Sequence, residues 1–173
     1  IPGIKLQFHQ EETAMKIGFI GLGNMGGHMA RNLASAGHQV TGFDTADVSI
    51  EGVSKAGTAV EAAKGMDVVI TMLPNGAILR AVADEILPVM SAGAVFADCS
   101  TVDVDSARAV AEQAQALGVM PVDAPVSGGV GGADAGTLTF MVGGSAEAFD
   151  KTKPLFDIMG QKAVHCGPSG NGQ

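Results

Sequence analysis

The order of hydrophobic and polar residues from Met15 onward predicts a regular alternation of strands and helices. Short apolar runs rich in β-branched residues indicate buried strands, and longer segments with a hydrophobic residue every three or four positions indicate amphipathic helices. The strands are expected at 16–20, 39–43, near 58–60, 67–72, 95–98 and 120–123, with two later strands at 138–142 and 162–165.

Helices are expected between these strands. The first, 25–36, carries Met25, Met29 and Leu33 on one face and is followed by Gly37, a residue type that favours a left-handed helix stop. Further helices are expected at 47–55, 76–87, 104–117 and 145–156. Repeated strand–helix–strand units favour a parallel sheet. The expected fold class is therefore α/β, with a Rossmann-type, doubly wound and mainly parallel sheet that has extra strands at one edge.

The same pattern divides the chain into three parts. Residues 1–14 are mostly polar and lack the apolar core of a signal peptide, so we expect a non-native or disordered tail and a cytoplasmic protein. Residues 15–167 are expected to form one domain. The glycine-rich residues 168–173 are expected to begin a link to a further domain.

Composition restricts the possible partners. The chain has 18 acidic and 10 basic residues, a net charge of −8, and neither Tyr nor Trp. Such a chain repels a phosphate backbone and has few aromatic rings to stack on bases, so nucleic acid is not an expected partner. No apolar run approaches the roughly 20 residues that cross a bilayer, so no membrane partner is expected. The two cysteines, Cys99 and Cys166, lack the spacing of a metal site, and no metal is expected.

A glycine motif follows the first predicted strand and opens the first predicted helix: Gly21-Leu22-Gly23-Asn24-Met25-Gly26. In a dinucleotide-binding loop, Gly21 would allow the tight turn, Gly23 would let the backbone approach a pyrophosphate, and Gly26 would let the helix pack on the strand. The N-terminus of the helix attracts the phosphates. The motif in this position predicts a dinucleotide site, and a turn used only for packing is the alternative.

Asp44 ends the second predicted strand, at the position where a carboxylate accepts hydrogen bonds from the adenosine ribose. A carboxylate there repels a 2′-phosphate, and no Arg follows nearby to bind one. The expected cofactor is therefore NAD rather than NADP, and an exposed turn residue is the alternative.

Three further loops follow the later strands, and ligands of doubly wound sheets bind beyond the carboxyl ends of the strands. Leu73-Pro74 is either a cofactor contact or a helix entry, and Thr101 is either a cofactor contact or a helix cap. Ser127-Gly128-Gly129 offers a hydroxyl and open backbone donors to a small carboxylate, or is a glycine-rich bend. No catalytic residue is expected in this chain, because none of its histidines or lysines is a convincing proton donor and Tyr is absent.

These segments resemble the β-hydroxyacid dehydrogenase family. The resemblance covers residues 15–173 and is carried by the stretches 19–26, 29–33, 67–75, 98–101, 123–129 and 136–144, of which the Ala124–Gly129 and Gly136–Gly144 stretches are specific to the family. The chain departs from the usual pattern at two positions. The family usually has Ser where this chain has Cys99, and usually has a residue other than His where it has His28.

The resemblance implies roles for individual residues. Leu73, Pro74 and Thr101 would contact NAD, and Ser127-Gly128-Gly129 would hold the carboxylate of a small hydroxy acid. It also implies that the catalytic Lys and an all-helical second domain lie beyond Gln173, that the longer enzyme is an oligomer, and that this chain alone is inactive.

The substrate stays open among members of the family. Asn24 and the stretch 130–132 favour members that act on 3-hydroxyisobutyrate. Members that reduce tartronate semialdehyde, succinic semialdehyde or glyoxylate are the alternatives, and so is a non-catalytic dinucleotide-binding module.

Overall fold

The computed structural model describes residues 14–173, so the tail expected at 1–14 lies almost wholly outside the described residues. The strands of the described part are β1 (Lys16–Ile20), β2 (Gln39–Phe43), β3 (Ser54–Lys55), β4 (Val68–Thr71), β5 (Val95–Asp98), β6 (Met120–Asp123), β7 (Val126–Ser127), β8 (Leu138–Gly144) and β9 (Gly160–Gly167). The helices are α1 (Gly26–Ser35), α2 (Ala59–Ala63), α3 (Gly76–Ile86), the 3₁₀ turn η1 (Leu87–Val89), α4 (Val104–Ala116), α5 (Gly129–Ala135) and α6 (Ala146–Met159).

One mixed sheet organises these elements, in the order β3-β2-β1-β4-β5-β6-β8-β7, with β9 paired to β8. β1 to β6 are parallel to one another, whereas β8 runs antiparallel to β6 and β7 and parallel to β9. The chain proceeds outward from β1 to β3, returns to β4 beside β1, and then proceeds the other way. This reversal confirms the predicted Rossmann-type sheet with extra strands at one edge, and its switch point lies between β1 and β4.

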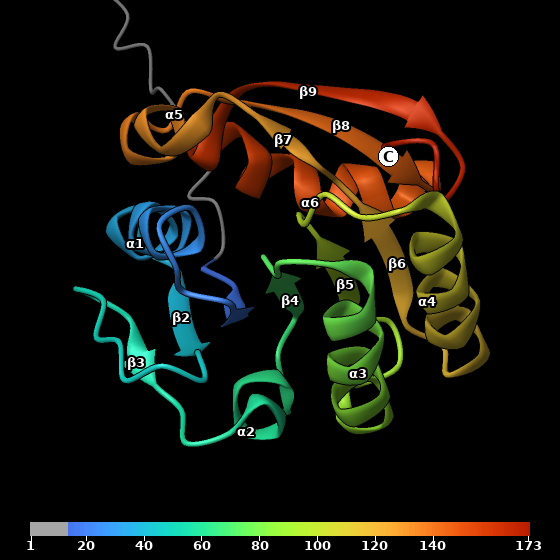
Figure 1. Ribbon diagram of the computed structural model, residues 1–173, viewed down its shortest axis with the longest axis horizontal. Coiled ribbons are helices and arrows are strands. Elements are labelled where there is room, and N and C mark those ends of the chain that lie inside the picture. Colours follow the sequence, from blue (N-terminus) through green and yellow to red (C-terminus); the bar gives the residue numbers. More distant parts are fainter. Residues whose placement is uncertain (1–13) are drawn as a thin grey trace, which may run out of the picture.

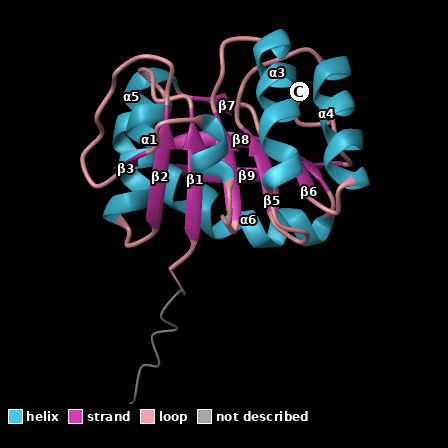
Figure 2. Cartoon of the chain, turned by 90° about the horizontal axis from the view of Figure 1, so that it is seen from below, coloured by secondary structure: helices cyan, strands magenta, loops and turns pink. Residues whose placement is uncertain are grey.

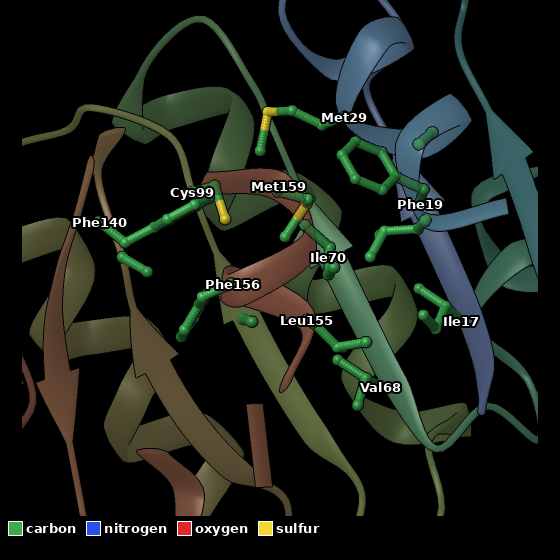
Figure 3. Packing of buried hydrophobic residues seen from close by; sticks show 14 of the residues in the cluster. Ile17, Phe19, Met29, Val68, Ile70, Cys99, Phe140, Leu155, Phe156 and Met159 are labelled. Atoms are coloured by element: carbon green, nitrogen blue, oxygen red, sulfur yellow. The ribbon is translucent and has the colours of Figure 1, made fainter. Parts of the chain in front are cut away.

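Helices cover both faces of the parallel strands (Figure 1). On one face, side chains such as Ile17, Phe19 and Ile70 pack against α1 and α6, and Figure 3 shows Met29 with Leu155 and Phe156 in this cluster. On the other face, alternate residues of the same strands pack against α2, α3 and α4. Because every strand residue of β4 and β5 is buried, these strands consist of continuous apolar runs with polar residues only at their carboxyl ends.

The region after β2 differs from the prediction. The strand expected near 58–60 is wrong: Thr58 is the N-cap of α2 and accepts the backbone N–H of Glu61 (3.1 Å), while the Glu61 carboxylate accepts that of Gly57 (2.8 Å). These two bonds form a variant of the capping box, in which Glu61 accepts the N–H of the residue before the N-cap, and they outweigh the β-branched residues that favoured a strand.

The helix expected at 47–55 is also wrong. Val48, Ile50 and Val53 pack against the core from an irregular loop, and Gly52, with φ +78°, turns the chain into β3 beside β2. Apolar spacing alone did not distinguish this covering loop from an amphipathic helix.

Two later segments also differ. The helix α5 was not expected: it follows the predicted bend at Ser127-Gly128-Gly129 and is capped by Gly136, with φ +70°. The helix α6 continues past its predicted end at 156 and includes Pro154, because buried Leu155, Phe156 and Met159 hold its last turns in the core. In residues 14–173, no helix combines the length and apolar character needed to cross a membrane.

Candidate functional site

The glycine loop lies at the switch point, at the carboxyl end of β1. Gly21 has φ +99°, and its N–H donates to the Phe43 carbonyl oxygen (2.9 Å). A Cβ at Gly21 would overlap the Met72 carbonyl oxygen, and one at Gly26 would overlap the Gly21 carbonyl oxygen. These two glycines are therefore required by the packing of β1, β4 and α1 against one another.

Gly23 has a different environment from these two glycines. A Cβ on Gly23 would meet no atom within 4 Å, so the backbone there faces open space. Within the described residues, no side chain caps the N-terminus of α1; the Gly27 N–H donates to the Gly23 carbonyl oxygen (2.9 Å), and the positive end of the helix faces the loop. The surface of the loop thus has the open backbone and positive helix end that bind a pyrophosphate.

Asp44 is hydrogen-bonded to this loop. Its Oδ2 accepts the N–H of Leu22 (2.8 Å) and its Oδ1 accepts the N–H of Ala46 (2.8 Å). A carboxylate has about four acceptor positions, so both oxygens can still accept hydroxyl groups. The basic residue of neighbouring β3, Lys55, is paired with Asp47, and this ion pair lowers the pKa of the Asp47 carboxyl.

A pocket of about 480 Å³ adjoins the loop. It is lined by Leu22, Gly23, Asn24, Gly27, His28, Arg31 and residues 48–51. A larger hollow of about 610 Å³ lies at the opposite, N-terminal ends of β4 and β5. Because ligands of doubly wound sheets bind beyond the carboxyl ends, the smaller pocket is the relevant one. His28, one of the histidines that the sequence did not identify as a proton donor, is among these lining residues.

The loops after β4 and β5 meet beside the glycine loop. The N–H of Leu73 donates to Ser100 Oγ (2.7 Å), and the Ser100 hydroxyl in turn donates to Asp98 Oδ1 (2.6 Å). Leu73 is half-buried, and Pro74 and Thr101 are exposed at the carboxyl edge. Asn75 caps α3 and Asp103 caps α4, so Thr101 is not the helix cap that was its alternative role.

Ser127-Gly128-Gly129 connects β7 to α5 and is exposed at the same edge of the sheet. Gly128 has φ +134° and Gly129 has φ +65°, and a Cβ on Gly129 would meet nothing within 4 Å. The segment therefore combines a free hydroxyl with open backbone, and all three groups of predicted site residues lie along one edge.

Asp98 was not predicted as part of this region. It is 3% exposed, and its Oδ1 accepts from Thr71, from the Ser100 hydroxyl and from the Ser100 N–H, whereas its Oδ2 has no partner among the described residues. Burial raises the pKa of Asp98 to about 6, against the opposing effect of these hydrogen bonds, and the nearby Asp123 also raises it. An acidic residue directly after a buried apolar run was the signal in the sequence that could have identified it.

Other histidines have structural contacts. His38 accepts the N–H of Met15 through Nδ1 (3.0 Å), and the ring of His165 stacks on Phe149. Within residues 14–173, no group of three or more His, Cys, Asp or Glu residues has the arrangement of a metal site.

Comparisons with known proteins agree with this geometry. Residues 16–167 match the protein family described as the NAD-binding domain of 6-phosphogluconate dehydrogenase. The chain is 45% identical over 165 residues to the 3-hydroxyisobutyrate dehydrogenase of Pseudomonas aeruginosa, covering 91% of this chain and 55% of that protein. It is also 45% identical over 166 residues to the NAD-dependent L-serine dehydrogenase of the same organism, covering 91% and 56%.

Among solved structures, the 3-hydroxyisobutyrate dehydrogenase of Mycobacterium tuberculosis with L-serine superposes with a TM-score of 0.89 at 43% identity, covering 92% of this chain and 56% of that one. The chain thus spans somewhat more than half the length of the relatives that it matches.

Proposed function

This chain belongs to the family of the NAD-binding domain of 6-phosphogluconate dehydrogenase, and from that premise we propose that it is the NAD-binding part of a dehydrogenase of small 3-hydroxy acids. The observation that carries the proposal is the hydrogen bond from Leu22 to Asp44 beside the open backbone of Gly23. This bond joins a carboxylate that suits a ribose to a loop that suits a pyrophosphate, and so supports a dinucleotide site at the carboxyl ends of the strands.

The residues present fit NAD. The loop at Gly21–Gly26 and the N-terminus of α1 would hold the pyrophosphate, and Asp44 would accept the hydroxyls of the adenosine ribose. Leu73, Pro74 and Thr101, across the switch point from Asp44, would then lie along the nicotinamide half. Bound NAD would supply the acceptor for a hydride.

The proposed substrate is a 3-hydroxy acid with a substituent on the carbon next to the carboxylate. Both 3-hydroxyisobutyrate and L-serine, the compounds in the names of two relatives, have a hydroxymethyl group on that carbon. Ser127-Gly128-Gly129 would hold the carboxylate through the hydroxyl and the open backbone N–H groups. We take 3-hydroxyisobutyrate as the first compound to test.

Proton transfer is the step that this chain does not support. Removing a hydride from an alcohol also requires a base for the hydroxyl proton. In the part of the chain that the structure describes, no hydrogen bond or ion pair joins Ser127-Gly128-Gly129 to a Lys or His side chain, and His28 is paired with Asp134 (3.4 Å). We therefore assign the proton to a group outside this chain, in a second domain following Gln173, and expect that residues 15–167 bind the cofactor without turnover.

Titration with NADH, NADPH and ADP-ribose, followed by fluorescence or calorimetry, tests the cofactor assignment. Tight binding of NADH and ADP-ribose, with weaker binding of NADPH, is expected. A preference for NADPH would contradict the role of Asp44.

An assay of the purified chain with NAD and either 3-hydroxyisobutyrate or L-serine tests the assignment of the proton. Turnover by this chain alone would contradict it.

A non-catalytic dinucleotide-binding module is the second candidate, favoured by the same lack of a proton-transferring group among the described residues. The full product of the parent gene, assayed on both hydroxy acids, separates the two candidates. Oxidation of either acid supports the dehydrogenase, and NADH binding without oxidation of any small hydroxy acid supports the module.

A further inference from the structure

The last residues of the chain are bound to a buried carboxylate at the end of β6. Asp123, 6% exposed, accepts the N–H of Gly170 through Oδ1 (2.7 Å) and those of Gly172 (2.9 Å) and Gln173 (3.3 Å) through Oδ2. All three bonds join residues 47 to 50 positions apart. Figure 2 shows the C-terminus near the edge of the sheet opposite to the end at which the chain enters β1.

Close packing surrounds this carboxylate. A Cβ on Gly172 would overlap Asp123 and the Met141 carbonyl oxygen, and a Cβ on Gly143 would overlap both Asp123 oxygens. The two glycines therefore let the backbone of 170–173 and that of β8 approach the same side chain. The contact as it stands therefore requires glycine at both positions.

Gln173 extends the contact to the loop after β5. Its Nε2 donates to the Ser100 carbonyl oxygen (2.9 Å), and its Oε1 accepts the N–H of Val102 (3.2 Å). These bonds lie on either side of Thr101, whose own side chain is exposed at the carboxyl edge. One amide group thus holds the backbone on both sides of a proposed cofactor contact.

We propose that Asp123 and Gln173 are positioning residues for the nicotinamide half of the cofactor site. Asp123 fixes the backbone of 170–173, this backbone places the Gln173 amide, and the amide holds the Ser100–Val102 loop that presents Thr101. The inference rests on the proposed function, because it takes the site at this edge to be the NAD site.

A carboxylate suits this role for a chemical reason. It accepts at both oxygens and donates at neither, which matches three converging N–H groups, and hydrogen bonds to a charged acceptor are stronger than neutral ones. An asparagine would turn one N–H₂ group toward at least one of these donors. Asp123→Asn therefore removes the match with almost no change of volume.

The consequence differs between the two halves of the cofactor. The adenosine half would be held by Gly21–Gly26 and Asp44, on the β1–β2 side of the switch point, and no hydrogen bond joins Asp123 or Gln173 to these residues. The nicotinamide half would then lie on the side of β4, β5 and β6. Loss of the contact at 170–173 should therefore lower the affinity for NADH and leave the affinity for ADP-ribose unchanged.

The test compares Asp123→Asn and Gln173→Ala with the wild-type chain and with Asp150→Asn, an exposed aspartate on α6. Amide hydrogen exchange by NMR is the first measurement. Each test variant should raise the exchange rate of the Val102 N–H about tenfold, as expected for a lost hydrogen bond of about 1.4 kcal/mol, and the control should not change it. Unchanged exchange at Val102 in both variants would overturn the proposal.

Binding is the second measurement. Each variant should lower the affinity for NADH about three- to tenfold and keep the affinity for ADP-ribose within about twofold of wild type. Equal weakening of both ligands, or of neither, would overturn the positioning role. If Asp123→Asn does not fold, Gln173→Ala, which keeps the buried carboxylate and its three bonds, carries the same test.

The two proposals fail in different ways. A wild-type chain that binds neither NADH nor ADP-ribose contradicts the proposed function. A wild-type chain that binds both, together with variants that bind both equally well, contradicts only the role of Asp123 and Gln173.

Discussion

The backbone N–H of Leu22 donates to the carboxylate of Asp44 at 2.8 Å, joining the glycine loop after β1 to the end of β2. The Asp44 side chain therefore has a fixed orientation before any ligand binds. A preorganised acceptor costs less conformational entropy on binding than a mobile one.

Asp44→Ala should lower the affinity for NADH about 10- to 100-fold, because hydrogen bonds to a charged group contribute about 1.5–3 kcal/mol. The affinity for NADPH should fall less or rise, since the repulsion of a 2′-phosphate is also removed. Fluorescence titration measures both affinities. Asp47→Ala, at an exposed carboxylate paired with Lys55, is the control. An equal loss for the two cofactors would contradict the assignment of Asp44.

Gly23→Ala and Gly26→Ala should separate binding from folding. The new methyl group at 23 meets open space, so the free energy of unfolding should stay within about 0.5 kcal/mol of wild type while NADH binds at least about tenfold more weakly. At 26 the methyl group overlaps the Gly21 carbonyl oxygen, and a loss of about 1–3 kcal/mol is expected. Denaturant unfolding and NADH titration of both variants check this contrast, and normal NADH affinity in Gly23→Ala would argue against a pyrophosphate at the loop.

Asp98→Asn should change how stability depends on pH. Burial raises the pKa of Asp98 to about 6 from 3.8, so the folded state binds this proton more tightly than the unfolded state. The contribution of Asp98 to stability is therefore present at low pH and is lost as pH rises from about 4 to about 6.

The free energy of unfolding of Asp98→Asn, relative to wild type, should therefore rise by up to about 3 kcal/mol between pH 4 and pH 7. Because only the change of this difference with pH is compared, any loss of stability that the substitution causes equally at every pH cancels. Urea unfolding at several pH values measures it. Parallel pH profiles for the two proteins would show that Asp98 is not a buried acid with a raised pKa.

The two thiols should differ in reactivity. Cys99 is fully buried, and burial raises the pKa of its thiol, whereas Cys166 is exposed at the edge strand β9. Because the thiolate is the reactive form, the native protein should react rapidly with one equivalent of a disulfide reagent and the denatured protein with two. Cys166→Ser should remove the rapid reaction. Rapid reaction of two thiols in the native protein would mean that the core around Cys99 opens readily.

The sequence predicted best those elements whose structure depends on neighbouring residues. Gly21 and Gly26 specify a backbone that only glycine adopts or accommodates, and the apolar runs of β4 and β5 specify strands buried on both faces. The helix at 59–63 was also predictable locally, because Thr58 and Glu61 have the spacing of a capping box, but the β-branched residues beside them suggested a strand. Here two local signals disagreed, and hydrogen bonds to otherwise unpaired N–H groups outweighed strand propensity.

The sequence by itself determined the strands β1, β2, β4, β5 and β6, the glycine loop and the carboxylate at the end of β2, because each follows from periodicity or from a residue's own backbone preferences. Only the tertiary structure decided the contacts that join the loops to one another. The bonds from Asp123 to 170–173 and from Gln173 to the Ser100–Val102 loop span 47 to 73 residues. No local pattern encodes such pairs, since they exist only after parallel strands have brought their carboxyl ends together and burial favours hydrogen-bond partners for the polar groups there.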